Sequence, residues 1–354
     1  MFVVLANTLV LGALFAAAEF AVRWHHEGGF RPAMRSMFGI TSAAEFAGAD
    51  GWLVTDPLLG YKLNPAHPNV NALGIRHADL DGDKPPDLFR VLVLGDSVAW
   101  PYDGFVTRLR ERIQELHAGP AEVINAAIPG YTTYQQRHLL ERDLMRLNPD
   151  LVILQYCLND NHQFLHRLNE TGRWLIAPAA QRALLAEDGG LFSRLVRSSY
   201  LLLELHPRLA ALGGNAGEAP WDRDAAFAPA WRRDTWVQID EHLRAIHERL
   251  TSIDARFAVV AVPIEAQLDP RLAARFGDRM LQPQRALTGI CRRLNIPILD
   301  LYPAFLEAPE DRLFTDGLHL SRAGHDLAAR EIERFLAREH LTSSDDAVSG
   351  PGAR

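Results

Sequence analysis

The chain has little cysteine and no excess of positive charge. Its 354 residues include only Cys157 and Cys291, which are too few for a disulfide framework or a four-cysteine zinc site. Lys and Arg number 37 against 44 Asp and Glu, which gives a net charge of −7, and the basic residues are scattered. Binding to nucleic acid needs clustered Lys and Arg, so we expect no nucleic-acid partner.

The overall composition is ordinary for a globular protein, but the first 22 residues differ from the rest. Hydrophobic residues make up 48% and charged residues 23% of the chain. The stretch Phe2–Ala18 is apolar apart from two positions. We interpret residues 1–22 as a membrane anchor or as a signal segment cleaved after Ala16–Ala18, with a buried helix as the third reading. The basic residues expected before either kind of segment are missing.

Hydrophobic periodicity predicts the fold class. Residues 23–88 lack sustained periodicity and indicate an irregular N-terminal arm. From residue 89 onward, strand and helix patterns alternate. Strands are predicted at 89–94, 122–126, 151–157, 257–262 and 297–301, and helices at 103–117, 133–147, 234–253, 283–294 and 322–338. This order predicts an α/β fold with a flavodoxin-like, doubly wound parallel sheet and an N-terminal hydrophobic helix.

Two further segments fall outside this alternation. Residues 163–232 are expected to form a helical insertion, in which Leu191–Leu212 is amphipathic. Such an insertion forms a lid or wall of a site, or only covers the sheet. Residues 339–354 are predicted to be a disordered tail, because they are mostly small and polar towards their end. The main domain is therefore expected at residues 89–338.

A serine stands at the end of the first predicted core strand. The apolar run Val91–Leu94 passes directly into Gly95-Asp96-Ser97. Catalytic groups of open α/β sheets gather where parallel strands end, which makes Ser97 a candidate nucleophile. A turn that merely caps the next helix would also favour small polar residues.

Three other segments place polar groups after predicted strands. Gly130 follows the second strand and could bring a backbone N–H close to a bound oxygen. Asn159-Asp160 follows the third strand and offers a side-chain amide. Near the C-terminus, Asp316 stands three residues before His319, a spacing that lets the carboxylate orient the imidazole. We expect these segments to converge.

These four motifs, in this order, resemble the four blocks of the SGNH hydrolases, also called GDSL-type esterases. The resemblance covers residues 89–338. It implies the SGNH hydrolase fold and a catalytic triad of Ser97 as nucleophile, His319 as base and Asp316 as orienting carboxylate. It also implies an oxyanion hole formed by the N–H groups of Ser97 and Gly130 and the side chain of Asn159. No cofactor or metal is implied.

One position departs from the family pattern. Cys157 stands where the third block usually has glycine, two residues before Asn159. A small buried residue at a strand end is favoured over a catalytic thiol.

For several other polar and aromatic residues, a role outside catalysis is favoured or equally plausible. His325 lies inside the last predicted helix and suits a surface or capping role better than that of catalytic base. His162 and His166 have a metal-ligand spacing but no evident third ligand, so a solvated helix face is favoured. Trp100 and Tyr102 follow the nucleophile closely and either line the substrate cleft or pack against the sheet edge.

The expected function is that of a serine esterase. Its substrate would be a small-molecule or glycan ester with a short acyl group, such as an O-acetyl group, and the reaction would pass through an acyl-serine. An O-acyltransferase acting on a cell-surface polysaccharide and a catalytically silent binding domain are the alternatives. The hydrophobic segment and the arm with Asn71–Arg76 resemble membrane-tethered bacterial members of the family. We therefore expect the catalytic domain outside the cytoplasm, tethered to a membrane or secreted after cleavage.

Overall fold

The computed structural model describes most of the chain. The described residues are 2–27, 30, 34, 52–78, 80, 83–163, 166–168, 174–176, 199, 201–202, 219–224, 226–308 and 312–342. Its strands are β1 (Leu53–Asp56), β2 (Gly60–Leu63), β3 (Phe89–Leu94), β4 (Ala121–Asn125), β5 (Leu151–Tyr156), β6 (His166–Leu168), β7 (Trp174–Ile176), β8 (Arg256–Ala261) and β9 (Ile298–Asp300). Its main helices are α1 (Phe2–Glu27), α3 (Phe105–Leu116), α4 (Thr133–Leu139), α8 (Thr235–Thr251), α9 (Pro270–Phe276), α10 (Gln282–Arg293), α11 (Tyr302–Leu306) and α12 (Arg322–Arg338).

A five-stranded sheet forms the centre of the molecule. Its strand order is β4-β3-β5-β8-β9, and every neighbouring pair is parallel. All six residues of β3 and all six of β5 are buried, as expected for strands covered on both faces. The predicted parallel α/β sheet is confirmed, and its strand order is the flavodoxin-like one.

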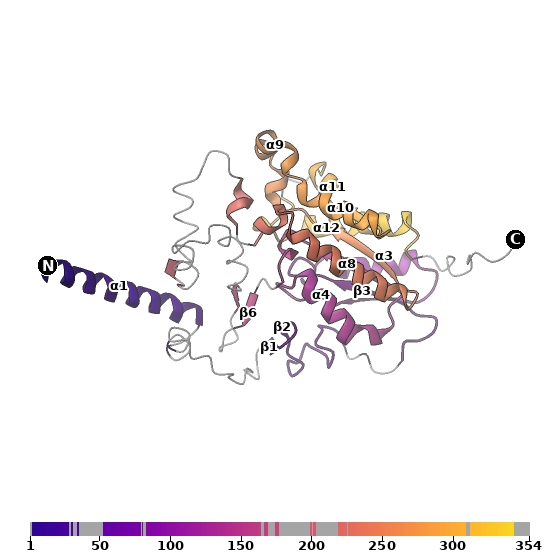
Figure 1. The fold of residues 1–354 in the computed structure, drawn as a ribbon. Coiled ribbons are helices and arrows are strands. Elements are labelled where there is room, and N and C mark those ends of the chain that lie inside the picture. Colours follow the sequence, from indigo (N-terminus) through magenta and orange to yellow (C-terminus); the bar gives the residue numbers. More distant parts are fainter. Residues whose placement is uncertain are drawn as a thin grey trace.

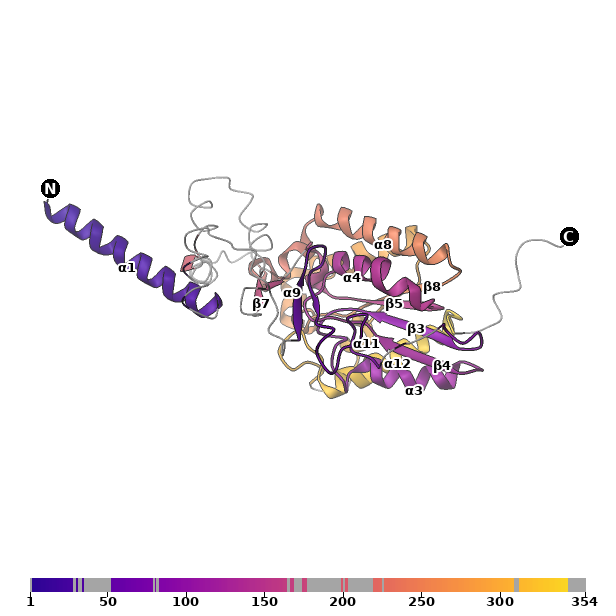
Figure 2. The same ribbon diagram turned by 90° about the horizontal axis from the view of Figure 1, so that it is seen from below.

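Helices cover both faces of the sheet. In Figure 2, α4 and α8 lie on one face, while α3 and α12 lie on the other. The buried apolar side chains accordingly form two clusters, one on each side of the sheet. Leu92 and Leu94 of β3 belong to the cluster under α8, and Val91 and Val93 belong to the cluster under α3. The alternation of side chains along the strand sends them to opposite faces.

The second predicted helix, at 133–147, is less regular than expected. It is α-helical only as far as Leu139, continues as a π turn over Leu140–Leu144, and ends in a 3₁₀ turn. Asn148 ends it in the left-handed conformation, with φ of 49°. The hydrophobic spacing shows that the segment is helical, but it does not reveal the change in hydrogen-bond pattern.

Helix α1 projects away from the sheet (Figure 1). Within the residues that the structure describes, no helix is long and apolar enough to cross a membrane, so the predicted transmembrane helix in residues 1–22 is not supported. The C-terminal part of α1 contains Glu19 and Arg23, which form a buried ion pair of 2.6 Å. Glu19 also accepts a hydrogen bond of 2.6 Å from Ser199 Oγ.

The prediction of an irregular arm over residues 23–88 is wrong for residues 53–63, while residues 64–78 contain no helix or strand. Strands β1 and β2 form an antiparallel hairpin around a tight turn. Leu59, Tyr61, Leu63 and Ile75 are at most 1% exposed and belong to the core cluster that contains Leu92. The arm therefore contributes to the core, although its turn-forming residues hide the strands from a periodicity analysis.

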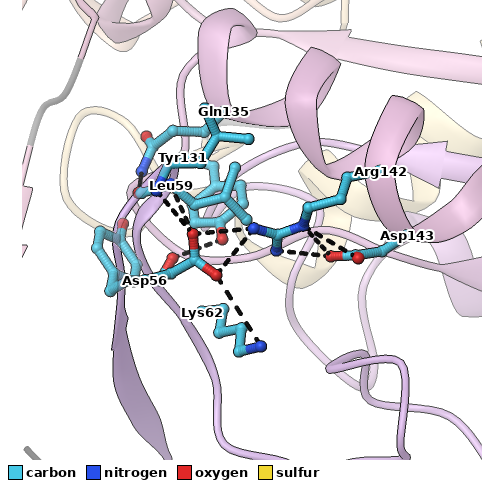
Figure 3. A network of polar contacts seen from close by, with 9 residues as sticks. Asp56, Leu59, Lys62, Tyr131, Gln135, Arg142 and Asp143 are labelled. Atoms are coloured by element: carbon cyan, nitrogen blue, oxygen red, sulfur yellow. Dashed lines mark hydrogen bonds and ion pairs between the residues drawn. The ribbon is translucent and has the colours of Figure 1, made fainter.

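Polar contacts join this hairpin to the helix that follows β4 (Figure 3). The Asp56 carboxylate accepts hydrogen bonds from the N–H groups of Leu58 and Leu59 and from Arg142 Nη1, at 2.9–3.0 Å. Burial raises the pKa of Asp56, but these hydrogen bonds outweigh it and hold the pKa below its usual value. Gln135 Nε2 donates to Leu59 O at 2.6 Å. The hairpin is thereby fixed against the α4 segment.

The insertion and the tail are only partly described. The amphipathic stretch Leu191–Leu212 lies almost wholly outside the described residues, as do residues 343–354. Residues 166–168 and 174–176 pair as antiparallel strands, a hairpin that the prediction of a helical insertion missed. The first residues of the predicted tail are ordered, since Leu341 is buried and its carbonyl accepts a hydrogen bond from Arg256.

Replacing Asp56 by Asn should destabilise the protein by about 1.5–3 kcal/mol, because a buried hydrogen-bonding carboxylate then loses its charge beside Arg142. The measurement is urea denaturation of both proteins at pH 7. Asp278→Asn is the control, because its side chain is fully exposed, and it should leave the midpoint unchanged. Equal midpoints for Asp56→Asn and the parent chain would contradict the structural role of this carboxylate.

Candidate active site

The turn after β3 is shaped by close packing. A Cβ atom on Gly95 would lie 2.5 Å from Gln155 Oε1 and 2.9 Å from Ala99 Cβ, so only glycine fits there. Asp96 N donates to Gln155 Oε1 at 3.1 Å, and the Asp96 carboxylate accepts from Val98 N at 2.9 Å. These contacts place Ser97 just after the carboxyl end of β3, where its side chain remains partly exposed.

Ser97, His319 and Asp316 form a continuous hydrogen-bonded chain. His319 Nε2 lies 2.8 Å from Ser97 Oγ, although the two residues are 222 positions apart. His319 Nδ1 lies 2.7 Å from Asp316 Oδ2. The other carboxylate oxygen accepts from the backbone N–H of His319 at 2.9 Å, which fixes the carboxylate relative to the imidazole. The predicted convergence of the first and fourth motifs is therefore found.

The carboxylate of Asp316 is largely exposed to solvent. The side chain of Asp316 is 57% exposed, and that of His319 is 39% exposed. Burial raises the pKa of Asp316, but the hydrogen bonds from the His319 N–H, the imidazole and the Leu318 N–H together outweigh it and lower the pKa. Asp316 is therefore a carboxylate at neutral pH and is suited to accept the proton on Nδ1.

Hydrogen bonds tie the segments of the three expected oxyanion donors to the turn after β3. Ile128 N donates to Gly95 O at 3.1 Å, which fastens the loop of Gly130 to the nucleophile turn. Asn159 Nδ2 donates to Asp96 Oδ2 at 3.0 Å, and this leaves its second hydrogen available. Within the described part of the chain, neither Ser97 N nor Gly130 N donates a hydrogen bond. Such unpaired N–H groups can stabilise an oxyanion.

The sequence of residues 93–327, more than half of the chain, matches the GDSL-like lipase/acylhydrolase family. The chain belongs to this family. It is a carboxylic-ester hydrolase, and the sequence resemblance stated above is confirmed. The search of curated proteins finds no relative.

Several solved structures are similar to part of this chain at low sequence identity. A lipase/acylhydrolase from Enterococcus faecalis is 17% identical, with a TM-score of 0.41, and the match covers 71% of this chain and 96% of that one. A catalytic mutant of an acetylxylan esterase from Geobacillus stearothermophilus is 16% identical, with a TM-score of 0.42 and coverage of 70% and 94%. An acetyl xylan esterase named AlAXEase is 15% identical, with a TM-score of 0.40 and coverage of 69% and 98%.

Two buried carboxylates, those of Asp96 and Asp160, form hydrogen bonds with residues next to the candidate active site of this hydrolase. Asp160 accepts hydrogen bonds from Thr133 Oγ1, Gln136 Nε2 and Cys157 N, and so connects the start of α4 to the third motif. Burial raises the pKa of both Asp96 and Asp160, and in each case hydrogen bonds to the carboxylate oppose the shift. Sequence reasoning placed Asp160 beside Asn159 but gave it no role.

Cys157 is accommodated without strain in place of glycine. Its backbone is extended, with φ of −126° and ψ of 163°, a conformation that any residue adopts. The side chain is fully buried, and burial raises the pKa of its thiol well above the usual value. The predicted reading as a small buried residue is confirmed, since a thiol with a raised pKa is a poor nucleophile.

Two other histidines are buried and lie within hydrogen-bond distance of backbone groups. His325 is buried, and its Nδ1 accepts a hydrogen bond of 3.2 Å from the Phe105 N–H at the start of α3, so the expected capping role is confirmed. His162 is also buried, with Nε2 lying 3.1 Å from Ala226 O, and the predicted solvated helix face is wrong. The described residues contain no cluster that could hold a metal ion.

Trp100 and Tyr102 enclose an arginine from the N-terminal arm. The guanidinium carbon of Arg76 lies 3.7 Å from the centre of the Trp100 ring and 3.6 Å from that of Tyr102. Arg76 Nη2 donates to Trp100 O. Trp100 packs against the core, whereas Tyr102 is 61% exposed. These stacking contacts bind the arm to the segment that follows Ser97.

A cavity of about 710 Å³ lies against the turn Asp316–Leu318. Its walls combine apolar side chains, such as Phe227, Leu272 and Phe305, with the carboxylates of Asp224 and Glu265. Trp221, Asp224 and Phe227 come from the end of the predicted insertion and line this cavity, as does Asp316. A cavity of this volume is typical of sites for small molecules.

Replacing His319 by Ala should lower kcat by ~10⁴-fold or more, because Ser97 then has no base within reach. His325→Gln should retain most of the activity, since His325 is occupied in capping α3. The measurement is ester hydrolysis by the two variants side by side. Greater loss in His325→Gln than in His319→Ala would overturn the choice of base.

The same His325→Gln variant should change the acid stability of the hydrolase. Burial lowers the pKa of His325 to about 4, and the Arg108 charge adds to this effect, so the unfolded chain binds the proton first. Stability attributable to His325 is full above about pH 6.5 and is lost as pH falls towards 4. The free energy of unfolding is measured by urea denaturation at several pH values between about 4 and 6.5. Its increase with pH should be smaller in the variant, by up to about 1.4 kcal/mol per pH unit.

Proposed function

We propose that this hydrolase cleaves the ester of a short acyl group, such as an O-acetyl group on a glycan, through an acyl-serine intermediate. The observation that carries the proposal is the hydrogen-bonded chain from Ser97 Oγ through the His319 imidazole to Asp316. The three residues then have the roles of nucleophile, base and orienting carboxylate. The donors of the oxyanion hole are the N–H groups of Ser97 and Gly130 and the amide of Asn159.

The geometry supports a two-step reaction. His319 Nε2 takes the hydroxyl proton of Ser97 as Oγ forms a bond to the carbonyl carbon of the ester. The tetrahedral oxyanion is stabilised by the three donors, and the bond to the alcohol oxygen breaks as that oxygen receives the proton from His319. Water then attacks the acyl-serine by the same route, which releases the carboxylic acid and restores the Ser97 hydroxyl.

The walls of the cavity support a carbohydrate as the alcohol portion of the substrate. Carboxylates such as Asp224 and Glu265 can accept hydrogen bonds from sugar hydroxyl groups, while rings such as Phe227 offer apolar faces to the C–H groups of a sugar. Of the candidate triad, Asp316 lines this cavity.

We also propose that the catalytic domain lies outside the cytoplasm, held to a membrane by α1 or secreted after cleavage. The support comes from large apolar side chains of α1 that have no cover, since Val10 is 57%, Leu11 67% and Leu14 62% exposed. Apolar side chains gathered on one element in this way mark interaction sites.

Hydrolysis of 4-nitrophenyl esters, from acetate to decanoate, should fall with acyl length and should be lost in Ser97→Ala. The full chain and the variant are compared in parallel, with an acetylated oligosaccharide as a second substrate. Turnover that persists in Ser97→Ala would contradict the acyl-serine mechanism. Acyl transfer to an added glycan acceptor in preference to water would favour the acyltransferase reading instead.

After expression of the full chain with a C-terminal tag, the protein should be recovered with membranes or outside the cytoplasm. The double variant Leu11→Glu, Leu14→Glu should shift it to the soluble cytoplasmic fraction, because charged side chains weaken contact with lipid and with export machinery. The N-terminal sequence of the recovered protein then distinguishes tethering from cleavage. A parent chain found wholly in the cytoplasm would refute the proposed location.

A further inference from the structure

Tyr61, on strand β2, reaches the loop that carries Gly130. Its hydroxyl donates a hydrogen bond of 2.7 Å to Pro129 O, 68 residues further along the chain. The side chain is fully buried, and burial raises the pKa of the hydroxyl well above its usual value, so it remains a donor. Tyr61 precedes the residues 93–327 that match the family, so the family resemblance assigns it nothing.

The acceptor of this hydrogen bond and the Gly130 N–H belong to the same peptide group. The described chain contains no cis peptide bond, so Pro129 C=O and Gly130 N–H point in opposite directions across a planar unit. Whatever fixes the direction of the carbonyl therefore also fixes the direction of the N–H. Hydrogen bonding to a carbonyl in addition polarises the N–H of its peptide group.

Gly130 itself cannot supply this constraint. Its φ of 73° lies in the left-handed region, and glycine is the residue with the greatest freedom to rotate there. Within the described residues, Gly130 N donates to no protein acceptor. The Tyr131 N–H donates to Ile128 O at 3.1 Å and closes a turn around this peptide. That bond is common to turns of type I and type II, in which the central peptide points in opposite directions. The Tyr61 hydroxyl contacts the central peptide itself and favours one of the two directions.

Tyr61 is in turn held from several sides. Tyr131 Oη donates to Tyr61 O at 2.7 Å, and the two rings pack edge to face with centroids 5.3 Å apart. Gln135 and the Asp56–Arg142 contacts hold the turn that precedes Tyr61, as Figure 3 shows. The hydroxyl is therefore fixed relative to α4 and does not depend on the long chain segment in between.

We propose that Tyr61 is a positioning residue of the oxyanion hole: its hydroxyl holds the Pro129–Gly130 peptide so that the Gly130 N–H points at the oxyanion. This inference rests on the proposed function, which makes Gly130 N a donor. It extends the catalytic machinery to the N-terminal hairpin. If Tyr61 had a purely structural role, its buried hydroxyl would need a hydrogen-bond partner, but the direction of the Gly130 N–H would not depend on it.

The test compares Tyr61→Phe with Tyr131→Phe in the full chain. Both substitutions remove one buried hydroxyl whose hydrogen bond is 2.7 Å long, and both keep the ring. Tyr61→Phe should lower kcat by about 5- to 50-fold with KM nearly unchanged, which is less than the ~10²–10³-fold that follows loss of a donor. Tyr131→Phe should lower kcat less, because the Tyr131 hydroxyl contacts Tyr61 O and not the Pro129–Gly130 peptide. Equal losses of kcat in both variants, or none in Tyr61→Phe, would overturn the proposal.

A transition-state analogue separates positioning from general destabilisation. A trifluoromethyl ketone adds to the serine and forms an anionic tetrahedral adduct that needs the oxyanion donors. Its inhibition constant should rise in Tyr61→Phe by about the factor lost from kcat/KM, and it should rise less in Tyr131→Phe. An inhibition constant that does not change in Tyr61→Phe contradicts the proposal.

The orientation of the peptide can also be read without turnover. The sequence has only two Pro-Gly pairs, so labelling proline carbonyls with ¹³C and glycine with ¹⁵N selects the amide signals of Gly130 and Gly352. Tyr61→Phe should shift the Gly130 signal and speed its hydrogen exchange, and an unchanged signal refutes the inference. If Ser97→Ala stays active, the proposed function fails, whereas this signal still decides the role of Tyr61.

Discussion

The parallel pairing of β3 with both of its neighbours is the constraint on which the site depends. Backbone hydrogen bonds align β3 with β4 on one side and with β5 on the other. The loops after these three strands therefore leave the sheet at one edge and carry Ser97, Gly130 and Asn159 to the same place. Their convergence follows from the direction of the strands, which explains how short motifs far apart in the sequence form one site.

Buried polar groups then set the fine geometry at this edge. Gln155, Asp96, Asn159 and Asp160 are all at most 3% exposed, although burying carboxylates is costly. The cost is offset because each carboxylate accepts two or more hydrogen bonds, as from Val98 N and Asn159 Nδ2 to Asp96. These hydrogen bonds orient the donors before substrate arrives. Asp316, by contrast, is exposed and is oriented by local contacts with the backbone of its own turn.

Much of this arrangement could be predicted from the sequence because its signals are local. The apolar runs of β3 and β5 determine buried strands, and the spacing of Asp316 and His319 places both side chains on one turn. The hairpin of β1 and β2 was missed because its strands are only four residues long and are separated by a turn, although Asp56-Pro57 and Gly60 are turn signals that could have indicated it. The buried position of His325 was not predictable, since it depends on the N–H of Phe105, 220 residues away.

The hairpin of β1 and β2 belongs to the same folded unit as the sheet, although it lies outside the residues that match the family. The family match begins within β3, yet Leu59, Tyr61 and Leu63 share a core cluster with residues of β3, β5 and α8. Removing the hairpin would expose that cluster and would free Pro129 O, so stability and geometry would change together. A short antiparallel hairpin is marginal by itself and gains its order by packing on the domain. The domain in turn receives from the hairpin a fixed hydrogen-bond donor to Pro129 O, next to Gly130, which is a form of preorganisation that local sequence motifs do not reveal.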